Sequence, residues 1–230
     1  MICRASTPQD LLGPLNEVEA KHAPTAIFTA GDARLLEIGA RVSIVGRRCA
    51  SPEGVRLASE LASLCAAQHV VVVSGLAEGV DTAAHVAAIG SGGRTIGVIG
   101  TPLDRVYPRR NAALQNLISR DHLLISPFPQ GAPIRRGNFL SRNRTMALIS
   151  DATVIIEAGE SSGSLQQGWE ALRLGRPLFI ARCAVDRVGL AWPAAMLGHG
   201  ASILSDETLD DLLDSLPPRV TVGPDGELPF

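Results

Sequence analysis

Short apolar runs of valine, isoleucine and leucine alternate with longer segments of helical periodicity along most of the chain. In the clearest example, four valines lead directly into Ser74 and Gly75, and the segment that follows places Asp81 and His85 four positions apart. Continuous apolar runs of this length are typical of strands in a parallel sheet that is buried on both faces. The pattern therefore predicts buried strands that alternate with helices.

The order of these segments defines a fold class. Ser51 followed by Pro52 is typical of a helix start, and the Pro- and Gly-rich segment 127–138 is expected to form a loop. Alternating strands and helices build βαβ units, so we expect a doubly wound α/β fold with a mainly parallel sheet. Strands are expected at 25–30, 41–46, 70–74, 94–100, 122–126, 152–158, 176–181 and 201–205, and helices at 55–68, 80–90, 110–119, 141–150, 164–175 and 206–216.

The same pattern divides the chain into three parts. Residues 1–40 are expected to be a lead-in, 41–216 the α/β domain, and the Pro- and Gly-rich residues 217–230 a loose tail. With 46% hydrophobic but only 3% aromatic residues, the 230-residue chain is predicted to be globular with an aliphatic core.

Composition also narrows the class of protein. No apolar run reaches the length of a membrane helix, and the N-terminus lacks the apolar run of a signal peptide, so we expect a cytoplasmic protein without a membrane partner. No two cysteines form a C-x-x-C pair, which indicates reduced thiols and neither a zinc site nor a disulfide framework. The cysteines are Cys3, Cys49, Cys65 and Cys183.

Charge is unevenly distributed along the chain. The net charge is −2, yet the segment 94–144 holds nine arginines against two aspartates, while acidic residues gather at 206–214. A preference for arginine explains why Lys21 is the only lysine, but it does not explain why the arginines cluster. Such a basic segment is suited to an anionic ligand.

Small and basic residues follow the predicted strands, where ligands of open α/β sheets bind. Glycines allow backbone N–H groups to approach a phosphate, and arginines donate bidentate hydrogen bonds to it. The predicted phosphate- or DNA-binding residues are Gly46, Arg47, Arg48, Ser74, Gly75, Arg142, Asn143, Arg144, Gly163 and Ser164.

Asp81 and His85 fall on one face of their predicted helix. A metal site or an acid–base pair is the alternative, but no third ligand lies nearby in the sequence. We therefore expect both to brace the pocket, with Asp81 supporting the turn and His85 hydrogen-bonded beneath it, and we expect no metal, no cofactor and no catalytic residue. Gly75 and Gly79 remain open to the simpler interpretation of ordinary turn glycines.

Arg142 and Arg144 flank Asn143, so they project differently from a helix; one is expected to bind the ligand and the other to pair with Glu157 or Asp151.

Several motifs stand in an order that resembles the DNA-processing protein A (DprA/Smf) family over residues 24–182. These motifs are VSIVGRR, VVSGLAEGVDTAAH, TIGVIGTPLDRVYP, FLSRNR and SSGSL…A…GRP.

The resemblance implies an extended Rossmann-like domain that binds single-stranded DNA, forms a homodimer and hands DNA to a RecA-type recombinase during natural transformation. It also implies that Arg48, Arg142 and Arg144 meet DNA phosphates in a pocket shaped by Gly46, Ser74 and Gly75. The chain departs from the family at Arg47, where the family usually has serine. For the dimer, the apolar segment 190–197 is either an interface strip or an internal helix.

A nucleotide-binding protein related to the lysine-decarboxylase-like phosphoribohydrolases is the alternative. The segment SSGSLQQ places Gln167 where those enzymes have a catalytic glutamate. Glutamine cannot act as a general base, and no P-loop motif is present. These two departures argue against hydrolysis but leave nucleotide binding open.

Overall fold

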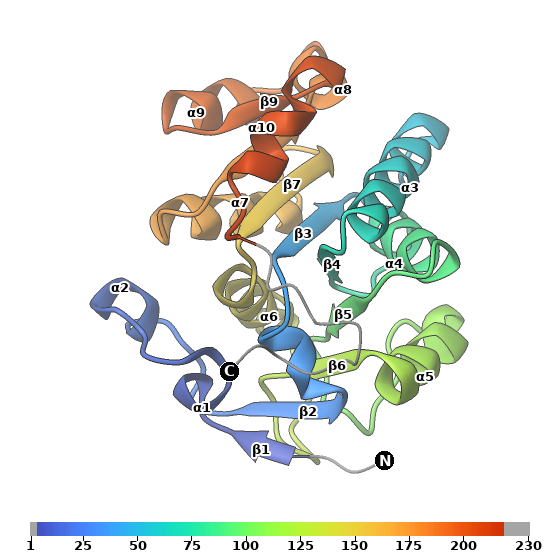
Figure 1. Ribbon diagram of the computed structural model, residues 1–230, viewed down its shortest axis with the longest axis vertical. Helices are drawn as coiled ribbons and strands as arrows, with labels where there is room; N and C mark the ends of the chain where they lie inside the picture. Colours follow the sequence, from blue (N-terminus) through green and yellow to red (C-terminus); the bar gives the residue numbers. More distant parts are fainter. Residues whose placement is uncertain (1–3, 219–230) are drawn as a thin grey trace.

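The computed structural model describes residues 4–218, and a single nine-stranded sheet runs through them in the order β1-β2-β6-β5-β4-β3-β7-β8-β9 (Figure 1). Strands β3 to β9 are parallel, whereas β1 and β2 run antiparallel at the edge beside β6. The strands are β1 Arg4–Ser6, β2 Ile27–Gly31, β3 Arg41–Gly46, β4 Val71–Ser74, β5 Thr95–Val98, β6 Leu123–Ser126, β7 Ala152–Glu157, β8 Leu178–Ala181 and β9 Ser202–Leu204.

Helices cover both faces of the sheet, which confirms the predicted doubly wound α/β fold. Buried side chains place α3, α4 and α10 on one face and α6, α7 and α9 on the other. The α-helices are α1 Pro8–Leu12, α2 Glu17–Ala20, α3 Pro52–Ala67, α4 Val80–Gly90, α5 Ala112–Asp121, α6 Arg136–Ile149, α7 Gly163–Arg173, α8 Arg182–Val185, α9 Trp192–Gly198 and α10 Leu209–Asp214; the 3-10 helices are η1 Ala33–Leu36, η2 Arg109–Asn111 and η3 Asp206–Thr208.

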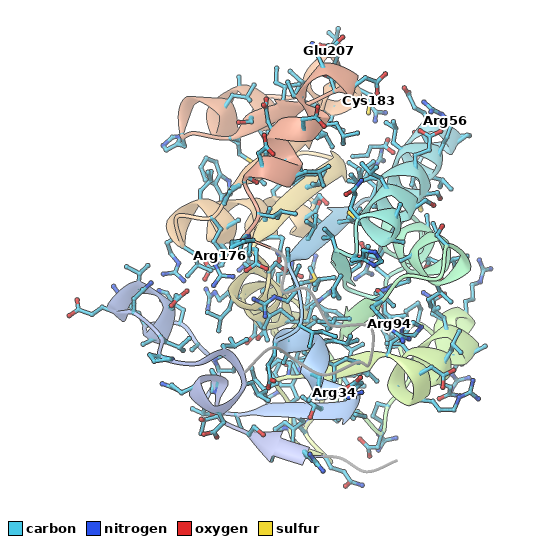
Figure 2. All side chains as sticks on the ribbon, viewed as in Figure 1. Arg34, Arg56, Arg94, Arg176, Cys183 and Glu207 are labelled. Atoms are coloured by element: carbon cyan, nitrogen blue, oxygen red, sulfur yellow. The ribbon has the colours of Figure 1, made fainter. Side chains whose placement is uncertain are left out.

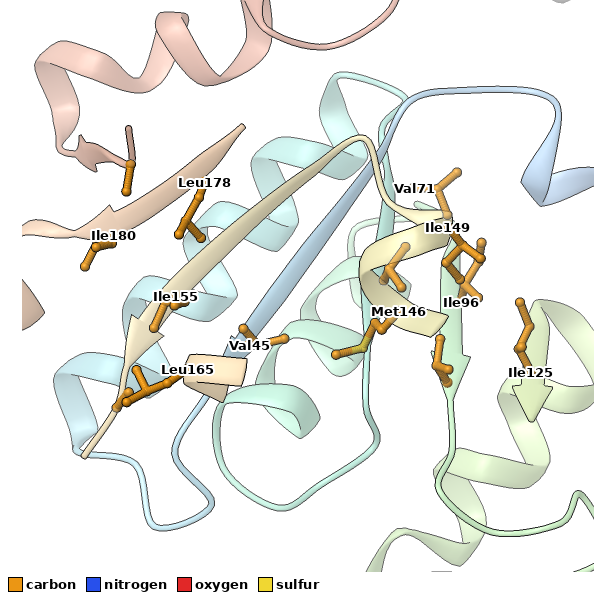
Figure 3. Packing of buried hydrophobic residues seen from close by; sticks show 14 of the residues in the cluster. Val45, Val71, Ile96, Ile125, Met146, Ile149, Ile155, Leu165, Leu178 and Ile180 are labelled. Carbon is orange, nitrogen blue, oxygen red and sulfur yellow. The ribbon is translucent and has the colours of Figure 1, made fainter. Parts of the chain in front are cut away.

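The valine run of β4 shows how a fully apolar strand serves two cores. Val71 and Val73 pack with α6, α7 and α9, whereas Val70 and Val72 pack with α3 and α4. Side chains alternate between faces along a strand, so a strand buried on both faces has no polar positions. Figure 3 shows the first of these clusters between the sheet and α6.

Two segments differ from the sequence-based expectation. Helix α6 begins at Arg136, inside the segment 127–138 that was expected to be a loop. Within the lead-in, the strand expected at 25–30 is present as β2, whereas β1 was not expected; both strands join the sheet at its antiparallel edge. The division of the chain into lead-in, domain and tail stays a prediction, and most of the tail lies outside the described residues.

The sheet order has one reversal that matters for function. From β3 the chain winds outward through β4, β5 and β6, and it then returns to the other side of β3 with β7, β8 and β9. The loops after β3 and β7 therefore leave the sheet in opposite directions and open a crevice between them. Ligands of doubly wound sheets bind at such a switch point.

Candidate nucleic-acid site

A pocket of about 740 Å³ lies at this switch point. It takes its walls from the end of β3, the loop after β7, the helices α6 and α7, and the segment that joins β4 to α4, which are distant in the sequence. The lining residues are Val45, Gly46, Arg48, Ala77, Asp81, Tyr107, Arg136, Gly137, Phe139, Leu140, Arg142, Asn143, Met146, Ser161, Ser162, Gly163, Ser164 and Gln167.

The turn that carries Arg48 is packed closely against the loop after β4. Gly79 has a φ of 79°, a conformation that favours glycine. A Cβ at Gly79 would lie 2.3 Å from the Arg47 carbonyl oxygen and 2.4 Å from that of Arg48, and the Val80 N–H donates to the Arg47 carbonyl at 3.2 Å. Gly79 is thus both a turn glycine and the residue that lets two loops of the site meet.

Arg142 is buried in the floor of the pocket, with only 6% of its surface exposed. Its guanidinium donates to the Val98 carbonyl at 3.3 Å and lies 4.0 Å from the Asp81 carboxylate. Burial lowers the pKa of Arg142, and burial also raises the pKa of Asp81, although the nearby Arg142 opposes that rise. Asp81 therefore supplies the counter-charge that allows a guanidinium to remain in this apolar surrounding.

Ser74 and His85 lie beneath the pocket and do not line it. The Ser74 hydroxyl donates to the Ile44 carbonyl at 2.6 Å and ties β4 to β3. His85 is fully buried, with Nδ1 2.7 Å from the Thr95 hydroxyl. Burial lowers the pKa of His85 to about 3, so its ring is neutral at physiological pH and has a structural role.

The N-termini of two helices face the pocket. Gly163 and Ser164 begin α7, where the Ser162 hydroxyl accepts from the Ser164 N–H, and Gly137 lies in the first turn of α6. The Asn143 amide donates to the Gly163 carbonyl at 2.9 Å and fixes one helix against the other. Helix N-termini carry partial positive charge and bind phosphates, so this wall suits an anion.

An aromatic pair also lines the pocket. The rings of Tyr107 and Phe139 lie 5.3 Å apart at 54°, and the Arg48 guanidinium lies 5.7 Å from the centroid of the Phe139 ring. Aromatic faces beside arginines bind nucleobases by stacking. The pocket thus combines surfaces for phosphates with surfaces for bases.

Two of the predicted arginines have other positions. Arg47 turns away from the pocket toward Glu157, at 3.4 Å. Arg144 is exposed on α6 and does not line the pocket. The expected pairing of Arg142 or Arg144 with Glu157 or Asp151 is wrong, because Glu157 pairs with Arg47 and Arg187, and Asp151 pairs with Arg41.

The pocket also holds residues that the sequence did not indicate. Arg136 falls in the segment that was expected to be a loop, where a solvated and a functional position were equally open, but it lies on the first turn of α6 at the pocket. Gln167, considered only as a substitute for a catalytic glutamate, is fully buried in contact with Ser43, Thr153 and Asn143. Ser161 and Ser162, which also line the pocket, belong to the motif SSGSL that the sequence analysis had singled out.

The family model for DNA recombination-mediator protein A matches residues 6–217. The chain belongs to this family. It is 39% identical over 166 residues to DNA processing protein DprA of Streptococcus pneumoniae and 32% identical over 196 residues to that of Bacillus subtilis. These matches cover 72% and 85% of the chain but only 58% and 65% of those relatives, so the chain spans about three fifths of their length.

Solved structures of the family share the fold. The structure of DprA from Streptococcus pneumoniae superimposes with a TM-score of 0.79 at 30% identity. The match covers 94% of this chain and 75% of the Streptococcus pneumoniae chain. A DprA structure from Helicobacter pylori, described for its single-stranded DNA binding mode, gives a TM-score of 0.77 at 28% identity. The match covers 93% of this chain and 98% of the Helicobacter pylori chain. The Rossmann-like architecture predicted from the sequence motifs is thereby confirmed.

Three further properties concern the part of the chain that the structure describes. No helix among residues 4–218 has the length and hydropathy needed to cross a membrane. Within the same residues, no three histidine, cysteine, aspartate or glutamate side chains are placed to hold a metal ion. The described cysteines Cys49, Cys65 and Cys183 are free thiols.

Proposed function

We propose that this protein binds single-stranded DNA in the pocket between β3 and β7. The observation that carries the proposal is the combination of Arg48, two helix N-termini and the Tyr107–Phe139 pair around one crevice. Single-stranded DNA exposes both its phosphates and its base faces, whereas a duplex hides the base faces in its stack. The similarity to the Helicobacter pylori protein, whose structure concerns single-stranded DNA binding, supports the same ligand.

The pocket favours binding over catalysis. Its buried acid, Asp81, faces Arg142, and its buried amide, Gln167, cannot act as a general base. Family membership supports DNA over the alternative of a free nucleotide. We therefore propose a non-catalytic DNA-binding protein, acting in the cytoplasm, that holds the strand by phosphate contacts and base stacking.

Fluorescence polarisation with a labelled forty-base oligothymidine at low salt tests this function. We expect saturable binding to the single strand and much weaker binding to a duplex of the same length. Absence of binding to the single strand, together with thermal stabilisation by mononucleotides, would replace the proposal with nucleotide binding. Release of base or phosphate from nucleotides would contradict the non-catalytic part alone.

We propose further that the bound strand is transferred to a RecA-type recombinase in DNA uptake. The family description as a recombination mediator supports this role. The test is the ATPase activity of a recombinase on DNA coated with single-strand-binding protein, which we expect to rise when this protein is added. An unchanged ATPase rate beside intact DNA binding would leave DNA protection as the function.

We also propose a homodimer that forms through the face of α7 and α9. The segment 190–197 itself is an internal helix, because Trp192 and Met196 belong to the core. Trp169 on α7 is nevertheless 38% exposed and lies edge-to-face with the ring of His199, 5.2 Å away. Half-buried Leu172 and Leu197 extend this apolar face, and a second copy of the same face is a suitable cover.

A further inference from the structure

A second hollow lies on the other side of the sheet, and the proposed DNA site does not use it. This groove has a volume of about 490 Å³ and lies between α3 and the segments that follow β8 and β9. None of its lining residues also lines the DNA pocket. Figure 2 shows Arg56, Cys183 and Glu207 at this end of the molecule.

The floor of the groove is apolar. Leu57, Leu61 and Leu64 lie on one side of α3, because residues three and four positions apart share a helix face. Leu204 and Leu209 face them from β9 and α10. Leu57, Leu64, Leu204 and Leu209 are only partly buried, so this strip keeps apolar surface that a ligand would remove from water.

The rim of the groove is acidic. Glu60 pairs with Arg56 on the same helix at 2.7 Å, and Glu207 lies 4.0 Å from Arg182. Among the described residues, the other three carboxylates of the rim form no ion pair; they are Glu53, Asp186 and Asp206. The groove thus presents an excess of negative charge around an apolar floor.

These two features select the chemistry of the ligand. Phosphates of a nucleic acid would be repelled by the carboxylates, and a neutral apolar ligand would not use them. A helix with leucine-type side chains on one face and lysine or arginine beside them would satisfy both the floor and the rim. We infer that this groove binds a basic amphipathic helix of a partner protein.

A synthetic peptide of leucines and lysines with helical amphipathic spacing is the probe. A second peptide of the same composition in scrambled order, which forms no apolar face, is the control ligand. We expect the full-length protein to bind the first peptide with micromolar affinity in fluorescence polarisation and to bind the second at least tenfold more weakly. Binding is expected to weaken with added salt because the rim charges are exposed.

Matched variants locate the binding. Leu57→Ser should lower the affinity for the amphipathic peptide roughly tenfold, because a leucine contact buried by the peptide is lost. Val55→Ser, at an exposed position of α3 outside the groove, should leave that affinity unchanged. Changing Glu53 and Asp206 to lysine should lower the affinity for the amphipathic peptide more than changing Asp210 and Asp214 to lysine, although both double variants change the net charge equally. Circular dichroism of each variant checks the fold.

Three outcomes would overturn the inference: no binding of the amphipathic peptide, equal binding of both peptides, or equal weakening by the two charge reversals. A fourth is a fall in the mass of the protein in solution with Leu57→Ser, which would assign the groove to a second copy of the chain. Affinity for oligothymidine is expected to stay unchanged in the groove variants, so this test and the test of the DNA site are independent.

Discussion

The Arg142 guanidinium lies directly against the backbone of Gly75, in the space that any larger residue would need. A Cβ at Gly75 would be 1.3 Å from Nη1 of Arg142. The absence of a side chain at Gly75, directly after β4, therefore leaves room for the guanidinium of Arg142, which α6 places in the floor of the pocket. This relationship joins two motifs that lie more than sixty residues apart in the chain.

Gly75→Ala should displace Arg142 and damage both stability and binding. Overpacking of this kind costs about 1–3 kcal/mol, measurable as a lower midpoint in urea unfolding, and affinity for oligothymidine should fall with it. Gly90→Ala is the matched control, because Gly90 lies in α4 with nothing within 4 Å of its Cβ position. If both variants unfold at the same urea concentration, the contact between Gly75 and Arg142 is not tight.

The Asp81–Arg142 pair is expected to stabilise the fold as a unit. Removal of one partner from a buried pair leaves an uncompensated charge and costs about 3–5 kcal/mol. We therefore expect Asp81→Asn and Arg142→Met each to lower the free energy of unfolding, and the double variant to lose less than the sum of the two. Additive losses in this double-mutant cycle would show that the two groups, 4.0 Å apart, act separately.

His85 should make the stability of the protein depend on pH. Burial lowers the pKa of His85 to about 3 in the folded protein, whereas a histidine in an unfolded chain titrates near 6.5. Below about pH 6.5 the unfolded state binds a proton that the folded state does not, so the contribution of His85 to stability is lost as the pH falls, at up to ~1.4 kcal/mol per unit.

Urea unfolding of the wild type and of His85→Gln tests this linkage. The difference in unfolding free energy between them should narrow by roughly 2 kcal/mol between pH 7 and pH 5. Val86→Ala, at an exposed position of the same helix, removes no titratable group and is the control, so its difference should stay constant. A constant difference for His85→Gln as well would contradict the buried neutral ring.

The sequence was informative where local pattern and topology agree. The valine run specifies a buried strand, and Ser51 with Pro52 specifies the start of a helix, both through short-range interactions. The parallel order of the strands then brings Gly46, Arg48 and Gly163 to one edge of the sheet. These positions follow from the rule that the carboxyl ends of parallel strands meet at the same edge.

The remaining features depend on contacts between distant residues. Arg47 and Arg48 are identical in the sequence, yet Glu157 at the end of β7 draws one away from the pocket while the other stacks near Phe139. Arg136 lies beside a glycine and follows a proline-rich loop, so local propensity disfavours the helix that packing of α6 against α7 imposes. Strand β1 carries no apolar run because it is only three residues long and pairs on one side, at the edge of the sheet.

The proposed dimer should depend on Trp169. Trp169→Ser removes the exposed aromatic of the α7–α9 face, and we expect the mass in solution to fall from about twice the 24.1-kDa chain to that of a single chain. Val188→Ser is the control, because Val188 is 99% exposed in a loop and lies outside this face. Light scattering at micromolar concentration distinguishes the two. A wild-type mass equal to one chain would reject the dimer.

Single-stranded DNA affinity should depend on Arg48 more than on arginines elsewhere on the surface. Arg48 is exposed at the pocket, and it forms no ion pair among the described residues. Each phosphate neutralised on a single strand contributes about −0.7 to the slope of log K against log salt. Arg48→Ala should therefore weaken binding to every oligonucleotide sequence and flatten the slope by roughly 0.7.

Arg120→Ala is the matched control for this prediction, because it removes the same charge from α5, where Arg120 pairs with Asp121 at 2.7 Å outside the pocket. Phe139→Leu separates stacking from charge: it should lower affinity with little change in the salt slope, since no phosphate contact is lost. Titrations at four salt concentrations measure affinity and slope together. If Arg48→Ala and Arg120→Ala weaken binding equally, DNA is held by diffuse surface charge and the pocket between β3 and β7 is not its site.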